Sequence, residues 1–146
     1  MWAKNILLKK QGFFIQLTCM IKDEAIKYWL NQSEKDIQTA KDLYRLDHYD
    51  WSLFVWHLAI EKILKAKIVS LDKKITYTHD LSRLAKEGNL PLNEELVSQL
   101  NEITTFNIEA RYDDYKLSFY NKATKEYTKK WIKICEEIYQ FVKKSI

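Results

Sequence analysis

Glycine and proline are nearly absent from this chain, and their scarcity limits the possible fold more than any other feature. The 146 residues include 2 Gly and 1 Pro, whereas a sandwich or barrel of many short strands needs these residues at its turns. Apolar residues make up 47% of the chain, enough surface to offset chain entropy, which argues against disorder. A chain of this length forms one domain around one core. We therefore expect a single all-α domain.

Apolar residues recur every three or four positions in several segments, the spacing that lines one face of a helix. The segments with this spacing are 20–46, 51–70, a short stretch after Thr78, 93–110 and 117–144. We expect Asp50, Thr78 and Asn93 to cap the second, third and fourth helices, with Asp80 in the first turn of the third. The fourth helix should end before Arg111. The pattern predicts a compact up-down bundle of about five helices.

The first 19 residues form a region of their own. Residues 13–21 are largely apolar and follow three lysines, so they weakly imitate a secretory signal. The stretch is too short to span a bilayer and lacks a small-x-small cleavage site, which argues against export and membrane anchoring. We expect residues 1–19 to be an appendage or an over-extended start, and residues 20–146 to be the helical domain.

The second helix differs from the others because it is apolar on two sides. One stripe contains Trp51, Phe54, Val55 and Leu58, and the other contains Leu53, Trp56, Ile60, Ile63 and Leu64. A helix that is apolar nearly all round is central in its bundle or lies between subunits. The pattern predicts a core helix, a dimer interface, or both.

Charge and cysteine content permit several partners without requiring one. The net charge is +4, and the lysines at positions 122, 125, 129 and 133 share one face of the last helix. Glutamates interrupt this field, so we interpret the lysine face as solvated surface rather than a nucleic-acid track. Cys19 and Cys135 lie far apart, without metal-ligand or disulfide spacing. This favours structural thiols in a reducing cytoplasm.

Cofactor motifs are missing from the sequence. His48, His57 and His79 are scattered without a metal-binding spacing, so we expect no metal site. Gly12 and Gly88 cannot form a phosphate-cradling loop, which needs closely spaced glycines. We therefore expect no bound cofactor, and any nucleotide must be held by side chains.

Two clusters combine charge with aromatic neighbours. Glu61, Lys62 and Lys65 share a side of the second helix, where Glu61 and Lys65 form an i,i+4 pair that could be an ordinary stabilising contact. The second cluster precedes the last helix and contains Asn107, Glu109, Arg111, Tyr112, Asp113 and Asp114. A capping and salt-bridge role there is about as well supported as a functional one.

Four motifs occur in order across about residues 24–142. They are Trp29 with Ser33-Glu34-Lys35-Asp36-Ile37, then Tyr49, Trp51, Phe54 and His57 leading into Ala59-x-Glu61-Lys62-x-Leu64-Lys65-Ala66, then Thr78-His79-Asp80-Leu81, and finally Glu109-Ala110-Arg111-Tyr112. Together they resemble the motifs of the HEPN domains (higher eukaryotes and prokaryotes nucleotide-binding).

The resemblance implies a usually dimeric bundle of about five helices. It also implies a cleft where polar residues of the second helix meet those of the loop before the last helix. Many such domains are metal-independent ribonuclease toxins with an Arg followed four to six residues later by His. Arg111 occupies the place of that arginine, but no histidine follows it in this chain.

Domains that lack this motif resemble accessory subunits of minimal nucleotidyltransferases in toxin–antitoxin modules, and some are proposed to bind nucleotides. We therefore expect a non-catalytic cytoplasmic homodimer. Its expected partner is a nucleotide (ATP or GTP), RNA or a minimal nucleotidyltransferase, and we expect no association with a membrane. The alternatives are a purely structural partner subunit and a metal-independent ribonuclease with an atypical active site that uses His79 or Asp113. The candidate ligand-binding residues are Lys62, Lys65, His79, Arg111, Tyr112 and Asp113.

Overall fold

Six α-helices and no strand make up the part of the chain described by the computed structural model, which is the backbone of residues 2–115 and 117–146 and the side chains of residues 21–115 and 117–146. The helices are α1 (Trp2–Arg45), α2 (Tyr49–Ser70), α3 (Leu81–Glu87), α4 (Glu94–Glu109), α5 (Ser118–Lys122) and α6 (Lys125–Lys144). The predicted all-α fold is confirmed.

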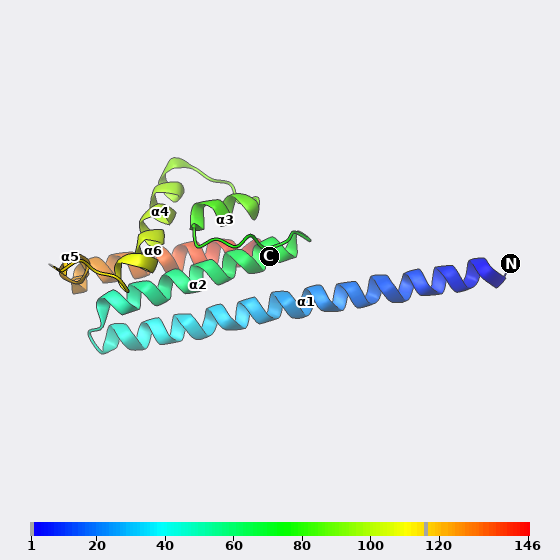
Figure 1. Cartoon of the computed structure of the whole chain (residues 1–146), viewed down its shortest axis with the longest axis horizontal. Coiled ribbons are helices and arrows are strands. Elements are labelled where there is room, and N and C mark those ends of the chain that lie inside the picture. Colours follow the sequence, from blue (N-terminus) through cyan, green and yellow to red (C-terminus); the bar gives the residue numbers. More distant parts are fainter. Residues whose placement is uncertain (1, 116) are drawn as a thin grey trace.

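Helix α2 is the centre of the bundle. It runs antiparallel to the C-terminal half of α1, with α6 beside it and α3 and α4 covering the side away from α1 (Figure 1). It also contacts α5. Because every other helix packs against α2, the prediction of a core helix is confirmed.

The two apolar stripes of α2 have different surroundings. Leu53, Trp56, Ile60, Ile63 and Leu64 have no exposed surface. In the other stripe, Trp51 is 44% exposed, and the remaining three residues are half-buried. The first stripe forms the core, while the second leaves apolar surface at the edge of the bundle.

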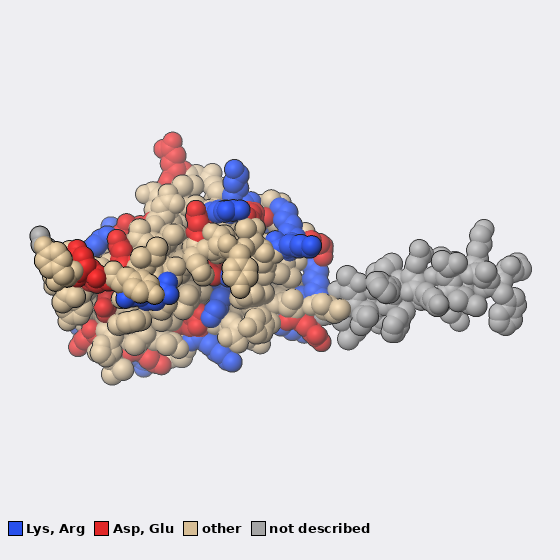
Figure 2. Space-filling model, viewed as in Figure 1, with Lys and Arg blue, Asp and Glu red and all other residues tan. Residues whose placement is uncertain are grey.

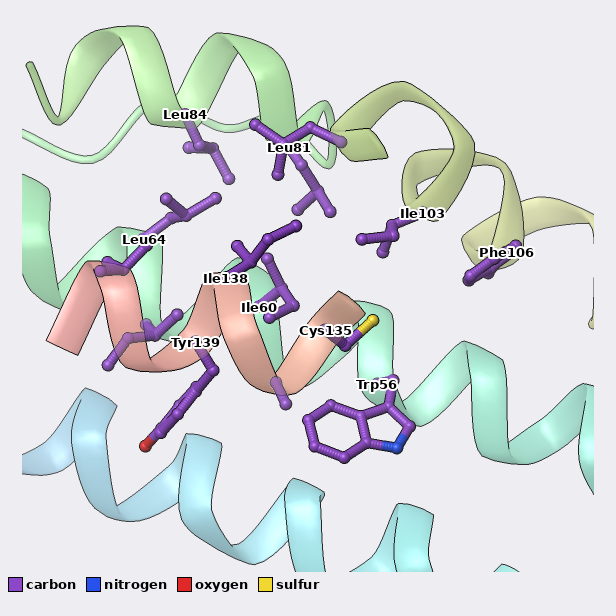
Figure 3. Close-up of a cluster of buried hydrophobic side chains, with 14 of the residues drawn as sticks. Trp56, Ile60, Leu64, Leu81, Leu84, Ile103, Phe106, Cys135, Ile138 and Tyr139 are labelled. Carbon is purple, nitrogen blue, oxygen red and sulfur yellow. The ribbon is translucent and has the colours of Figure 1, made fainter. Parts of the chain in front are cut away.

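Side chains from four helices meet in the core shown in Figure 3. Burying a large apolar side chain stabilises the fold by about 1.5–3 kcal/mol. The labelled residues are Trp56, Ile60 and Leu64 of α2, Leu81 and Leu84 of α3, Ile103 and Phe106 of α4, and Cys135, Ile138 and Tyr139 of α6.

Two polar or ionisable groups of α6 are buried in this region. The Tyr139 hydroxyl points toward α1, where it lies 3.1 Å from the Ser33 hydroxyl oxygen (Figure 3). Cys135 is fully buried, and burial raises the pKa of its thiol. This agrees with a structural role for Cys135, whereas the side chain of Cys19 lies outside the described residues.

Two helix starts differ from the prediction. Helix α1 begins at Trp2 rather than Met20, because a single glycine at position 12 costs only about 1 kcal/mol and does not end a helix. The side chains of the predicted appendage, residues 1–19, lie outside the described residues. Helix α2 begins at Tyr49 with His48 as its N-cap, so Asp50 lies in the first turn and does not cap it.

Among the predictions for the later helices, one cap is confirmed, one cap is wrong, and the last helix is divided in two. Asn93 caps α4 by accepting a hydrogen bond from the Leu96 amide at 2.8 Å. Asp80, not Thr78, caps α3. The expected last helix is divided into α5 and α6, because the Thr124 side chain accepts a hydrogen bond from the Tyr127 amide and starts a new helix there.

No helix in the described part of the chain is long and apolar enough to cross a membrane.

Candidate functional site

Helix α2 places His57, Glu61 and Lys65 on one face, since they are spaced four residues apart. Glu61 is at the centre and is only 5% exposed. Its Oε1 accepts a hydrogen bond from Lys65 Nζ at 2.6 Å, and its Oε2 lies 3.2 Å from His57 Nε2. His57 is fully buried, and its Nδ1 lies 3.2 Å from the backbone carbonyl of Ile103 in α4.

The turn before α3 brings a second histidine to the same carboxylate. His79 Nδ1 lies 2.9 Å from Glu61 Oε2, while its side chain is 63% exposed. The neighbouring residues fix the turn: Asp80 caps α3 by accepting from the Arg83 amide at 3.0 Å. Leu81 is buried in the core, and its amide donates to the Thr104 hydroxyl at 3.2 Å. His79 is therefore held over α2 by a cap and a core anchor.

Glu61 remains ionised despite its burial. Desolvation by burial acts to raise the pKa of Glu61, but hydrogen bonds from His57, Lys65 and His79 outweigh it and lower the pKa to about 2. A carboxylate that accepts several hydrogen bonds from cationic or N–H donors is stabilised in its charged form. The cluster thus carries a fixed negative charge beneath its lysine.

A pocket of about 410 Å³ opens beside this cluster. Trp29 of α1, Lys65 of α2 and the loop residues Ile75–His79 line it. Lys65 Nζ lies 5.2 Å from the centre of the Trp29 ring, and Tyr77 is fully exposed at the rim. Aromatic faces beside a cation can hold a planar ring and an anionic group together.

Lys65 and His79 are the only predicted ligand-binding residues in the described chain that meet at this pocket. Lys62 lies on the same helix but pairs with Asp36 of α1 at 2.5 Å. That ion pair joins α1 to α2, and the side chains of both residues are largely buried.

The other three predicted residues gather at the C-terminal end of α4. The Arg111 guanidinium donates to the carbonyl and the side-chain oxygen of Asn107 at 2.7 and 3.0 Å. It lies 5.2 Å from the Phe54 ring and 5.4 Å from the ring of the exposed Tyr112. The guanidinium is therefore positioned by Asn107 of α4 and by Phe54 of α2.

Asp113 has a local structural role at the start of α5. Its two oxygens accept hydrogen bonds from the amides of Phe119 and Tyr120 at 3.0 and 2.8 Å. With Tyr112 it lines a separate pocket of about 300 Å³. Within one chain, the six predicted residues thus fall into three groups rather than the single expected cleft.

Three residues of this site, Trp29, His57 and Tyr77, were not among the predicted ligand-binding residues. Trp29 and His57 belong to the motifs that resemble HEPN domains, but the motifs gave them no site role. The spacing of His57 and Glu61 along α2 was available from the sequence and could have identified that pair. Trp29 gave no such signal, because its place above Lys65 depends on how α1 packs against α2.

The surface does not show a concentrated basic field on the face in view. Lysines and arginines are interspersed with acidic residues over the described part of that face (Figure 2). A protein that follows a nucleic-acid backbone typically presents a basic patch or stripe, so the mixed charges of this face do not favour such a partner.

Comparisons with known proteins agree with the motifs. A family model described as HEPN domain matches residues 26–145. The crystal structure of TT1696 from Thermus thermophilus superposes with a TM-score of 0.72 at 21% identity, covering 83% of this chain and 98% of that chain. ST0689, described as an archaeal HEPN homologue, superposes with a TM-score of 0.67 at 18% identity, covering 81% of this chain and 94% of that chain. No curated protein sequence matches.

Proposed function

The chain belongs to the HEPN domain family, and from that premise we propose that it is a non-catalytic nucleotide-binding subunit that pairs with a minimal nucleotidyltransferase. In this proposal it acts as a cytoplasmic homodimer in a module of the toxin–antitoxin type. The nucleotide-binding part of this proposal is based on the pocket between Trp29, Lys65 and the loop Ile75–His79.

The pocket has the chemistry that a nucleotide requires. Trp29 and Tyr77 offer aromatic faces, and stacking of a base on such a face contributes about 1–3 kcal/mol. Lys65 uses one of its three donors on Glu61, which leaves donors for phosphate oxygens. Backbone phosphate loops are not needed, in keeping with a chain so poor in glycine.

Two features support a non-catalytic role: no histidine follows Arg111, and Asp113 is already hydrogen-bonded to the backbone. The sequence contains three histidines, and none follows Arg111, so the general acid or base of the ribonuclease motif is missing. Asp113 cannot take over as general acid or base without breaking the hydrogen bonds that it accepts from the Phe119 and Tyr120 amides at the start of α5.

Calorimetric titration with ATP and GTP tests the nucleotide part. Full-length protein in EDTA should bind one of them saturably, and Lys65→Ala should weaken the affinity about tenfold to hundredfold, because a hydrogen bond to a charged group contributes about 1.5–3 kcal/mol. Lys133→Ala is the matched control, since Lys133 is 80% exposed on α6 and the substitution removes the same charge. Flat titrations with both nucleotides, or equal losses in the two variants, would refute the pocket.

Arg111→Ala locates the ligand. Because Arg111 does not line this pocket, the variant should bind nucleotide as tightly as the parent chain. A loss equal to that of Lys65→Ala would place the ligand elsewhere.

Incubation with labelled RNA tests the non-catalytic part. We expect no cleavage, and cleavage that disappears in Arg111→Ala would establish the ribonuclease alternative instead.

Co-purification tests the partner. A nucleotidyltransferase encoded beside this chain should be retained by tagged full-length protein, and its failure to bind when both are co-expressed would remove that part of the proposal.

A further inference from the structure

The fully buried ring of His57 faces two acceptors. Its Nδ1 lies 3.2 Å from the carbonyl oxygen of Ile103, and its Nε2 lies 3.2 Å from a carboxylate oxygen of Glu61. Both oxygens only accept hydrogen bonds, and a neutral ring carries a single hydrogen for these two partners. At the ring nitrogen that lacks the hydrogen, two lone pairs face each other and repel, and a cation between them removes the repulsion.

A proton on His57 would satisfy this pair alone, but His79 adds a third ligand atom at the same place. His79 Nδ1 lies 2.9 Å from the same oxygen, Glu61 Oε2. The three atoms all lie within 4.8 Å of one another. Two ligands of one tetrahedral zinc ion, at about 2.0–2.2 Å each, are separated by roughly 3.3 Å. The observed separations from the carboxylate oxygen are within a few tenths of an ångström of that value.

We propose that His57 Nε2, Glu61 Oε2 and His79 Nδ1 form a binding site for a divalent transition-metal ion of the zinc type. Two imidazoles and one carboxylate form a known zinc ligand set, which leaves a fourth position for water or another ligand. His79 also lines the pocket with Trp29 and Lys65, and its exposed side chain gives an ion access to the three ligands.

The surroundings of the three ligands support the assignment. Metal-bound histidines commonly donate their other ring nitrogen to a carbonyl or carboxylate, which fixes the ring. The Ile103 carbonyl has this position behind His57. Lys65 bonds to Oε1 and leaves Oε2 to the histidines. Four-residue spacing on α2 holds His57 and Glu61 on one face, as it holds paired ligands in helical zinc motifs.

Only the fold creates this site. Sequence spacing gave no metal motif, because His79 lies 18 residues after Glu61 and reaches it through the anchored turn before α3.

Cobalt substitution tests the proposal. Full-length protein is dialysed against EDTA, passed into metal-free buffer and titrated with Co²⁺, which absorbs visible light strongly when it is tetrahedrally coordinated by protein ligands. We expect one bound Co²⁺ per chain and its displacement by Zn²⁺. His79→Ala should weaken Co²⁺ binding by about tenfold or more, since even the loss of an outer partner of a ligand costs that much.

Two features keep the result interpretable. His79 is 63% exposed, so its removal should leave the circular dichroism spectrum and the folded state intact. His48→Ala is the matched control, because His48 is exposed at the N-cap of α2 and its side chain makes no capping bond. This variant should bind Co²⁺ as tightly as the parent chain.

Absence of Co²⁺ and Zn²⁺ binding, or equal binding by His79→Ala and the parent chain, would refute the site and assign the His57–Glu61 contact to a proton. The nucleotide titrations are carried out in EDTA, so the two proposals can fail separately.

Discussion

Replacing Glu61 by glutamine should destabilise the protein strongly, because it removes the negative charge that holds three donors together. Lys65 Nζ and His57 Nε2 both contact this carboxylate. Because His57 has no exposed surface, water cannot take the place of the carboxylate as its hydrogen-bond partner. Glutamine has the same shape, but its amide nitrogen would face donors rather than accept from them.

Two routes give the size of the effect. A carboxyl whose pKa falls from 4.5 to about 2 on folding contributes about 3 kcal/mol at neutral pH. Removing one partner of a buried ion pair costs about 3–5 kcal/mol. Part of the loss is recovered because the Lys65 side chain is 16% exposed, so we expect Glu61→Gln to lower the free energy of unfolding by about 3 kcal/mol.

Urea denaturation followed by tryptophan fluorescence measures this loss in the metal-free protein. For a chain of this size, about 3 kcal/mol corresponds to a decrease of about 10 °C in Tm. Glu137→Gln is the matched control, since Glu137 is 66% exposed and 4.0 Å from its lysine partner, and it should change stability by less than about 0.5 kcal/mol.

Acid should produce the same perturbation in the parent chain. Because folding lowers the pKa of Glu61, its contribution is fully present above pH 4.5 and is lost as the pH falls toward 2. The difference in stability between the parent chain and Glu61→Gln should therefore shrink over that interval. A variant within about 1 kcal/mol of the parent at neutral pH would show that the reasoning on the buried charge is wrong.

Four further predictions concern the rest of the bundle. Trp56→Asp puts a charge into the core and should cost more than about 4 kcal/mol, abolishing the helical circular dichroism signal. Trp51→Asp changes a residue that is 44% exposed, so the variant should fold but lower the light-scattering mass from two chains to one if its stripe is the dimer face. A parent chain that is monomeric at high concentration would contradict the proposed homodimer. Cys135 should resist labelling by iodoacetamide until urea is added, because it is buried and burial raises the pKa of its thiol. Peptide mass mapping after treatment of the native protein measures the labelling, and a labelled Cys135 in the absence of denaturant would contradict the prediction. For Glu102, burial acts to raise the pKa, but hydrogen bonds from side chains of α5 and α6 lower it overall. Its contribution is present above the unfolded pKa and lost in acid, so Glu102→Gln should lower the urea midpoint at neutral pH and not at low pH.

The helical character of the chain follows from local sequence properties. Apolar spacing and the scarcity of Gly and Pro act over a few residues, and so does a cap such as Asn93, which the structure confirms. Local signals also explain the errors at helix ends. Asp50 and Thr78 are both plausible caps, and the choice of His48 and Asp80 instead depends on where the tertiary contacts start each helix.

The same division separates the parts of the candidate site. The pairing of Glu61 with Lys65 is determined by helical spacing, so the sequence alone predicts it. The meeting of His79 and Trp29 with that pair is decided by the packing of α1, α2 and the Leu81 anchor, which brings together residues far apart in the chain. Burial is likewise a tertiary property, and it turns an ordinary surface ion pair into a desolvated cluster whose charges depend on one another.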